Sequence, residues 1–315
     1  MHTARWIKYK DYSGFVLIGG RAFSHPVNEN VHLDRAVFLA GQLESKYWGT
    51  VQNYDGCGMS GGILHNTAVL PSSAKKPLQI GSLLPLISSI VSEYPYASSV
   101  LALVNKLNIL DWYFKGEVLH SRKDNLAVSG REIRAEFSGS SNGAVKSTGP
   151  EADKAVEWLT LFSELLSSDF TFALQSKFAA NWIAENCMAP NLRGYSHLSS
   201  LRLPSLFTIS KSGLSSPELE LALCVYFAFV VNAPSRARKV LLDTVRTPDL
   251  SSEDFSVLLI RNLGKDTYGN WKDSPKDGSN RYDKARRVVW ESLDSKGNHI
   301  WDPALSHKLM PQDLT

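Results

Sequence analysis

Cysteine is scarce in this chain, which has three among 315 residues, at positions 57, 187 and 224. Their wide spacing offers neither a disulfide framework nor the closely spaced ligands of a metal site, which predicts synthesis in a reducing cytoplasm and no bound metal. Apolar runs are short, and none approaches the roughly 18 residues that a membrane-spanning helix needs. The first ten residues also lack the apolar core of a signal peptide. The sequence therefore predicts no membrane span and no signal-directed export.

Charge of neither sign is in large excess. The chain has 34 Lys and Arg residues against 31 Asp and Glu residues, for a net charge of +3. Two basic clusters, within residues 236–239 and 281–287, are typical of solvated helix faces. Because nucleic-acid recognition requires a basic stripe or a recognisable module, we expect no nucleic-acid partner. Phosphate-binding and dinucleotide-binding fingerprints are missing as well, so the sequence predicts no cofactor.

Apolar periodicity, by contrast, is plentiful. With 43% hydrophobic residues the chain can bury a sizeable core. A strand pair is expected around residues 14–20. Residues 111–150 mix charged and polar residues, and a flexible loop is expected at 138–143. Apolar residues at spacings of three and four predict helices at 81–94, 97–110, 151–167, 170–187, 217–231, 235–246, 251–263 and 281–293. The predicted fold class is α+β, mostly α.

Two carboxylates stand out, Glu44 and Asp55. Glu44 ends an apolar helical pattern that begins near residue 31, and burial there would raise the pKa of its carboxyl, as a general acid requires. Residues 50–54 alternate like a strand, Asp55-Gly56 is typical of a hairpin turn, and residues 59–64 can form the returning strand. Two carboxylates that face each other across a cleft can hydrolyse a glycosidic bond.

A longer pattern surrounds these two residues. It reads Glu44-Ser45, Gly49-Thr50-Val51, Asn53-Tyr54-Asp55-Gly56 and Gly58-Met59-Ser60-Gly61-Gly62, then Leu64 and Asn66, and it continues over residues 78–87. This pattern resembles the active-site signature of the lysozyme-like superfamily of peptidoglycan-directed bacterial and phage proteins, which are distantly similar to chitosanases. The resemblance implies a lysozyme-like fold over residues 31–263, with a small β-hairpin lobe and a larger helical lobe. Residues 1–30 would form an N-terminal lead-in, and residues 264–315 a C-terminal extension, packed on the domain or partly flexible.

The resemblance implies a muramidase, which hydrolyses the β-1,4 bonds between N-acetylmuramic acid and N-acetylglucosamine. Glu44 would be the general acid and Asp55 the general base, while Asp111, Glu117 and Asp153 are further acids that can replace Asp55. The expected substrate contacts are polar and aromatic residues of the hairpin region: Thr50, Gln52, Asn53, Tyr54, Ser60, His65 and Asn66.

Several alternatives stay open. A chitosanase-like enzyme shares the chemistry, a lytic transglycosylase can use Glu44 alone, and a non-catalytic glycan-binding or virion structural protein can keep the fold. Residues 63–65 depart from the family pattern, which leaves the preferred sugar open. Residues 58–62 also match G-x-S-x-G, but the serine-hydrolase elbow needs a strand immediately before it and a helix immediately after it, and the sequence predicts neither.

The expected partners follow from this substrate. A small positive charge suits an anionic polymer such as peptidoglycan. A bacteriolytic enzyme or toxin made in the cytoplasm without a signal peptide acts in the periplasm or cell wall only after delivery. Such delivery requires a holin, a phage particle or a secretion apparatus, and a bacterial toxin would also have an immunity protein.

Overall fold

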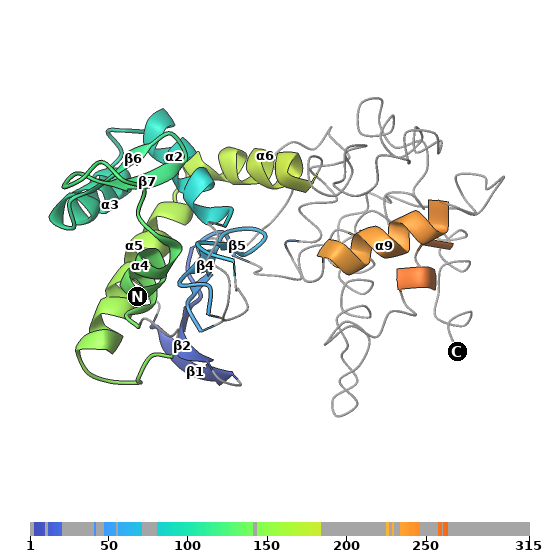
Figure 1. The fold of residues 1–315 in the computed structure, drawn as a ribbon, viewed down its shortest axis with the longest axis horizontal. Coiled ribbons are helices and arrows are strands. Elements are labelled where there is room, and N and C mark those ends of the chain that lie inside the picture. The colour runs from blue at the N-terminus through green and yellow to red at the C-terminus, as the bar shows by residue number, and fades with distance from the viewer. Residues whose placement is uncertain are drawn as a thin grey trace. The chain divides into compact units, whose positions relative to one another are not determined.

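The computed structural model describes residues 3–9, 12–20, 41, 47–54, 56–70, 81–140, 144–183, 225–226, 229, 234–245, 258–259 and 261–263 (Figure 1). The chain divides into two compact units. Unit 1 comprises residues 1–24 and 45–178, and unit 2 comprises residues 25–44 and 179–315. Most of the described elements belong to unit 1, and the described residues form a mixed fold of helices and antiparallel strands.

Unit 1 contains a five-stranded antiparallel sheet in which each strand pairs with the next one along the chain. The strands are β1 (Arg5–Tyr9), β2 (Tyr12–Leu17), β3 (Val51–Gln52), β4 (Ser60–Gly61) and β5 (Asn66–Thr67). In the register, Val16 of β2 lies opposite Gln52 of β3, and Gln52 lies opposite Ser60 of β4. The predicted hairpin after residue 50 is therefore confirmed. A strand pair is also present near the N-terminus, but it spans residues 5–17 in place of the predicted 14–20, and only β2 overlaps that range.

The helices with strong apolar periodicity are also confirmed. They are α2 (Leu83–Glu93), α3 (Ser98–Ile109), α5 (Pro150–Leu166), α6 (Phe172–Ile183) and α9 (Pro234–Val245), with the short 3-10 turn η1 (Asp169–Thr171) before α6. Of the helices predicted at 217–231 and 251–263, the few described residues are helical. The helix predicted at 281–293 lies outside the described residues. Among the described residues, no helix combines the length and apolar character needed to cross a bilayer.

Residues 111–150, where the sequence predicted only a loop at 138–143, contain further regular structure. They form a hairpin of β6 (Trp112–Lys115) and β7 (Val118–Ser121), followed by α4 (Gly130–Ser138). Gly116 makes the hairpin turn with φ +59°. A capping box begins α4: Glu132 N donates to Ser129 Oγ at 3.3 Å, and Ser129 N donates to Glu132 Oε2 at 2.9 Å.

Helix α5 is the centre of the core of unit 1. It packs against β2, β3 and β4 of the sheet and against the helices α3 and α4. Its predicted apolar face is buried, because Trp158 and Leu159 are fully enclosed and Phe162 is 1% exposed. The Phe137 ring of α4 lies 4.7 Å from the Trp158 ring. Each such large side chain stabilises the fold by about 1.5–3 kcal/mol.

Candidate functional site: the β3–β4 hairpin

The two predicted catalytic carboxylates, Glu44 and Asp55, lie outside the described residues. The chain on either side of Asp55 is described. Residues 53–59 connect β3 to β4, and this connection contains two glycines with positive φ, Gly56 at +78° and Gly58 at +75°. Close to Glu44, Gly41 is helical and buried, in agreement with the helix predicted there.

The β3–β4 hairpin is held from both sides within the sheet. β3 pairs with β2 as well as with β4, and β4 pairs with β5. Beyond the strands, Ala68 N donates to Met59 O at 2.7 Å and Val69 N donates to Cys57 O at 3.1 Å. Gly58 packs against α4, since the Cβ atom of an alanine at this position would lie 2.9 Å from Arg134 Cα. The connection that includes position 55 is therefore anchored shortly after Asp55.

Asn53 anchors the same connection on its other side. Its side chain is fully buried, and Phe15 N donates to Asn53 Oδ1 at 2.7 Å, while Asn53 N donates to Phe15 O at 3.0 Å. Gly14 leaves room for this arrangement, because an alanine Cβ there would lie about 3.0 Å from the backbone carbonyl of Asn53. Asn53 thus ties the start of the connection to β2 with both its backbone and its side chain.

A second buried polar group lies next to the turn that follows β4. Gln175 of α6 is fully buried, and its Nε2 donates to Leu166 O at 2.8 Å and to Thr171 Oγ1 at 3.1 Å. An alanine Cβ at Gly62 would lie 2.8 Å from Gln175 Oε1 and 3.6 Å from Asn66 Nδ2. Asn66 Oδ1 accepts a hydrogen bond from Ser82 Oγ at 2.9 Å. These contacts fix the turn after β4 to the start of α6 and of α2.

The seven predicted substrate contacts divide by exposure. Four of them are buried: Thr50 at 4%, Asn53 and Ser60 at 0%, and Asn66 at 6% exposure. The other three, Gln52, Tyr54 and His65, are partly exposed, and His65 has a positive φ of 49°. The structure therefore gathers all seven around one hairpin, but it presents only three of these side chains partly to solvent.

Trp48, an aromatic residue close to the hairpin, lies in the interior. It is 3% exposed, and its ring stacks on Phe172 at 4.4 Å between centroids with an interplanar angle of 12°. Its role in the structure is to join the segment before β3 to the first residue of α6.

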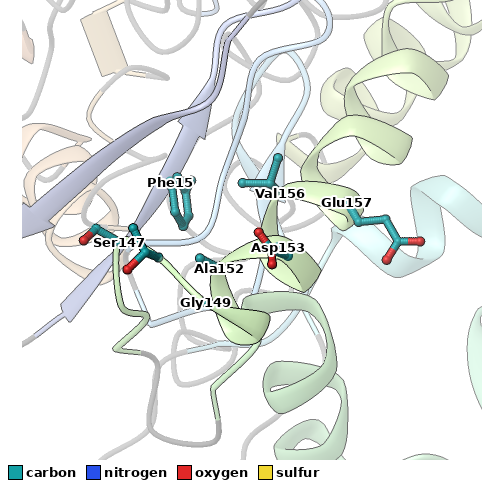
Figure 2. Close-up of a pocket in the computed structure, with 8 residues that line it drawn as sticks. Phe15, Ser147, Gly149, Ala152, Asp153, Val156 and Glu157 are labelled. Carbon is teal, nitrogen blue, oxygen red and sulfur yellow. The ribbon is translucent and has the colours of Figure 1, made fainter.

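A depression of about 440 Å³ lies between β2, residues 147–149 and the first turns of α5. Figure 2 shows Phe15 on the β2 side of this depression and Asp153 on the α5 side. Two acids line it one helical turn apart, Asp153 and Glu157, and Lys106 Nζ lies 2.6 Å from Glu157 Oε1. Asp153 lies in the first turn of α5, where a carboxylate complements the helix dipole. Among the described residues, no group of three or more His, Cys, Asp and Glu side chains converges as metal ligands would.

Sequence reasoning missed Gln175 and the serines of α5 that contact glycines near the hairpin, Ser163 and Ser167. No charge or motif marks these residues, because each acts through a single hydroxyl or amide inside the protein. Comparison with protein families, curated proteins and solved structures found no match for this chain.

Proposed function

We propose that this protein is a lysozyme-like glycoside hydrolase that cleaves the β-1,4 bonds of peptidoglycan. Glu44 protonates the glycosidic oxygen, and Asp55 activates the attacking water. The observation that carries this proposal is the anchored β3–β4 connection. Asn53 ties it to β2 two residues before Asp55, and Gly58 packs on α4 three residues after it. A general base must be held within a fraction of an ångström of its productive position, and residues tied to strands and a helix provide such rigidity.

The exposure of the hairpin side chains suggests which of them contact the glycan and which stabilise the hairpin. Gln52, Tyr54 and His65 keep part of their surface exposed, so we assign contact with the glycan to these three side chains. The buried side chains of Asn53 and Asn66 stabilise the hairpin through their hydrogen bonds with Phe15 and Ser82. The protein would be made in the cytoplasm and delivered to the cell wall, with peptidoglycan strands as its partner.

The test is digestion of purified peptidoglycan, with the soluble products identified by mass spectrometry. The wild-type protein should release muropeptides with reducing ends. Glu44→Gln should lower the rate by about 10²–10⁴-fold, the usual contribution of a general acid. Glu164→Gln, which removes an exposed carboxylate of α5, serves as the matched control and should leave the rate unchanged.

Other products would identify other functions. Anhydro-muropeptides would indicate a lytic transglycosylase, and cleavage of chitosan in place of peptidoglycan would indicate a chitosanase. If neither polymer is cleaved, the enzyme proposal is wrong, and a glycan-binding or structural role remains. Asp55→Asn and Asp153→Asn assign the base, because the proposal expects a large loss of rate only from the first of these two variants.

A further inference from the structure

Two serines at the C-terminal end of α5, Ser163 within the helix and Ser167 at its C-cap, contact three glycines from separate parts of unit 1. Ser163 Oγ donates to Gly49 O at 2.7 Å in a fully buried hydrogen bond, and Ser167 Oγ donates to Ser163 O at 2.5 Å. Gly49 N in turn donates to Gly19 O at 3.2 Å. We call these five residues, Gly19, Gly20, Gly49, Ser163 and Ser167, the glycine–serine clamp.

The three glycines can lie this close to the serines because they have no side chains. An alanine Cβ at Gly19 would clash with Ser163 Oγ, and one at Gly20 or Gly49 would clash with Ser167 Oγ. At Gly49 the same atom would also lie 2.7 Å from Ser163 O. Gly20 has a φ of +79°, which glycine adopts without strain. The backbone of both segments therefore lies directly against the serines of α5.

The clamp is placed where the chain leaves unit 1. Residues 25–44 belong to unit 2, so the chain passes out of unit 1 shortly after Gly20 and is back in it before Gly49. The third passage between the units lies within α6, after residue 178. Phe172, at the start of α6, stacks on Trp48, the neighbour of Gly49. Within unit 1, Gly20, Gly49 and the first residue of α6 therefore lie close to one another beside the end of α5.

We propose that Ser163 and Ser167 are positioning residues, which fix the backbone of unit 1 on either side of the segment 25–44. This segment includes Glu44, so its catalytic consequence rests on the proposed function, whereas the fixing of the chain does not. Ser163 is the main contributor, because its hydroxyl satisfies the carbonyl of Gly49 directly. Ser167 closes the packing from the next turn of α5.

The experiment compares Ser163→Ala with Thr160→Ala in the full-length protein. Thr160 is an exposed residue of the same helix, and its hydroxyl donates to Val156 O one turn earlier, at 2.9 Å. Hydrogen exchange is followed by mass spectrometry in peptides from the clamp, which cover residues 17–24 and 45–52, and in peptides from β1 and α3. Peptidoglycan hydrolysis is measured on the same samples.

Ser163→Ala should speed exchange in the clamp peptides about tenfold, because a buried carbonyl loses its donor and local opening becomes easier. The β1 and α3 peptides should not change, and Thr160→Ala should match the wild type throughout. The kcat value should fall about tenfold with KM within about twofold, since a displaced acid weakens transition-state stabilisation more than binding.

Two results would contradict the proposed positioning role of Ser163. Exchange that stays at the wild-type rate in residues 17–24 and 45–52 would show that the hydroxyl fixes nothing. Exchange that rises equally in β1 and α3 would show that Ser163 only stabilises unit 1 as a whole. If the wild-type protein cleaves no glycan, the proposed function fails, and the exchange data still decide the role of Ser163.

Discussion

Replacement of Asn53 by alanine tests whether the hairpin depends on the buried amide described above. The variant removes the acceptor of the 2.7 Å bond from Phe15 N and leaves that backbone N–H enclosed without a partner. An unsatisfied buried donor of this kind costs about 1–3 kcal/mol. Against a typical total stability of about 5–15 kcal/mol, this is a substantial loss. The backbone bond from Asn53 N to Phe15 O is unaffected by the change, so the register of the strands should survive.

Urea denaturation followed by tryptophan fluorescence measures this loss. At an m value near 2 kcal/mol/M, the midpoint should fall by about 0.5–1.5 M with no change in slope. Asn105→Ala is the matched control, because Asn105 is an exposed residue of α3, and its effect should stay within about 0.5 kcal/mol. If Asn53→Ala unfolds at the same urea concentration as Asn105→Ala, the side chain does not hold the hairpin, and the reasoning is refuted.

Two further predictions concern packing around the hairpin. Gly58→Ala and Gly116→Ala both place a methyl group at positive φ, but only the first meets a neighbour, at 2.9 Å from Arg134 Cα. Gly116→Ala should therefore cost about 1 kcal/mol and Gly58→Ala clearly more, and equal urea midpoints would show that Gly58 does not pack on α4. Trp48→Ala should destabilise unit 1 by about 3–5 kcal/mol, because the buried ring stacks on Phe172. Trp48→Phe should recover much of that loss in thermal unfolding, whereas a phenylalanine variant as unstable as the alanine variant would contradict a packing role.

The long helices could be predicted from sequence because their apolar faces are continuous. Trp158 and Phe162 of α5 recur at a spacing of four, and both are enclosed in the core. The β6–β7 hairpin and α4 were missed because their signals are short. The turn at Gly116 and the capping box of Ser129 with Glu132 were both present, but charged residues around them masked any longer apolar period.

The hairpin was predicted correctly, but the exposure of its residues was not apparent from the sequence. Polar residues are usually exposed, so the sequence predicted that Thr50, Asn53 and Ser60 contact the substrate. In the structure, β3 pairs with β2, α5 packs against the sheet, and these three polar side chains are buried. Their burial depends on elements distant in sequence, such as Phe15, which bonds Asn53 across 38 positions. Local patterns carry no information about such partners.

The 3.2 Å bond between Gly49 N and Gly19 O also has a topological consequence. Gly19 and Gly49 are bonded neighbours within unit 1, so residues 25–44, which belong to unit 2, are an insertion into unit 1. A short linker can replace an insertion whose ends lie close together, because the entropic cost of closing a loop is smaller for a shorter loop. We therefore expect a shortened chain, in which a few residues replace 25–44, to keep β2 and β3 paired. The segment that carries Glu44 could likewise be exchanged for another without redesign of the sheet.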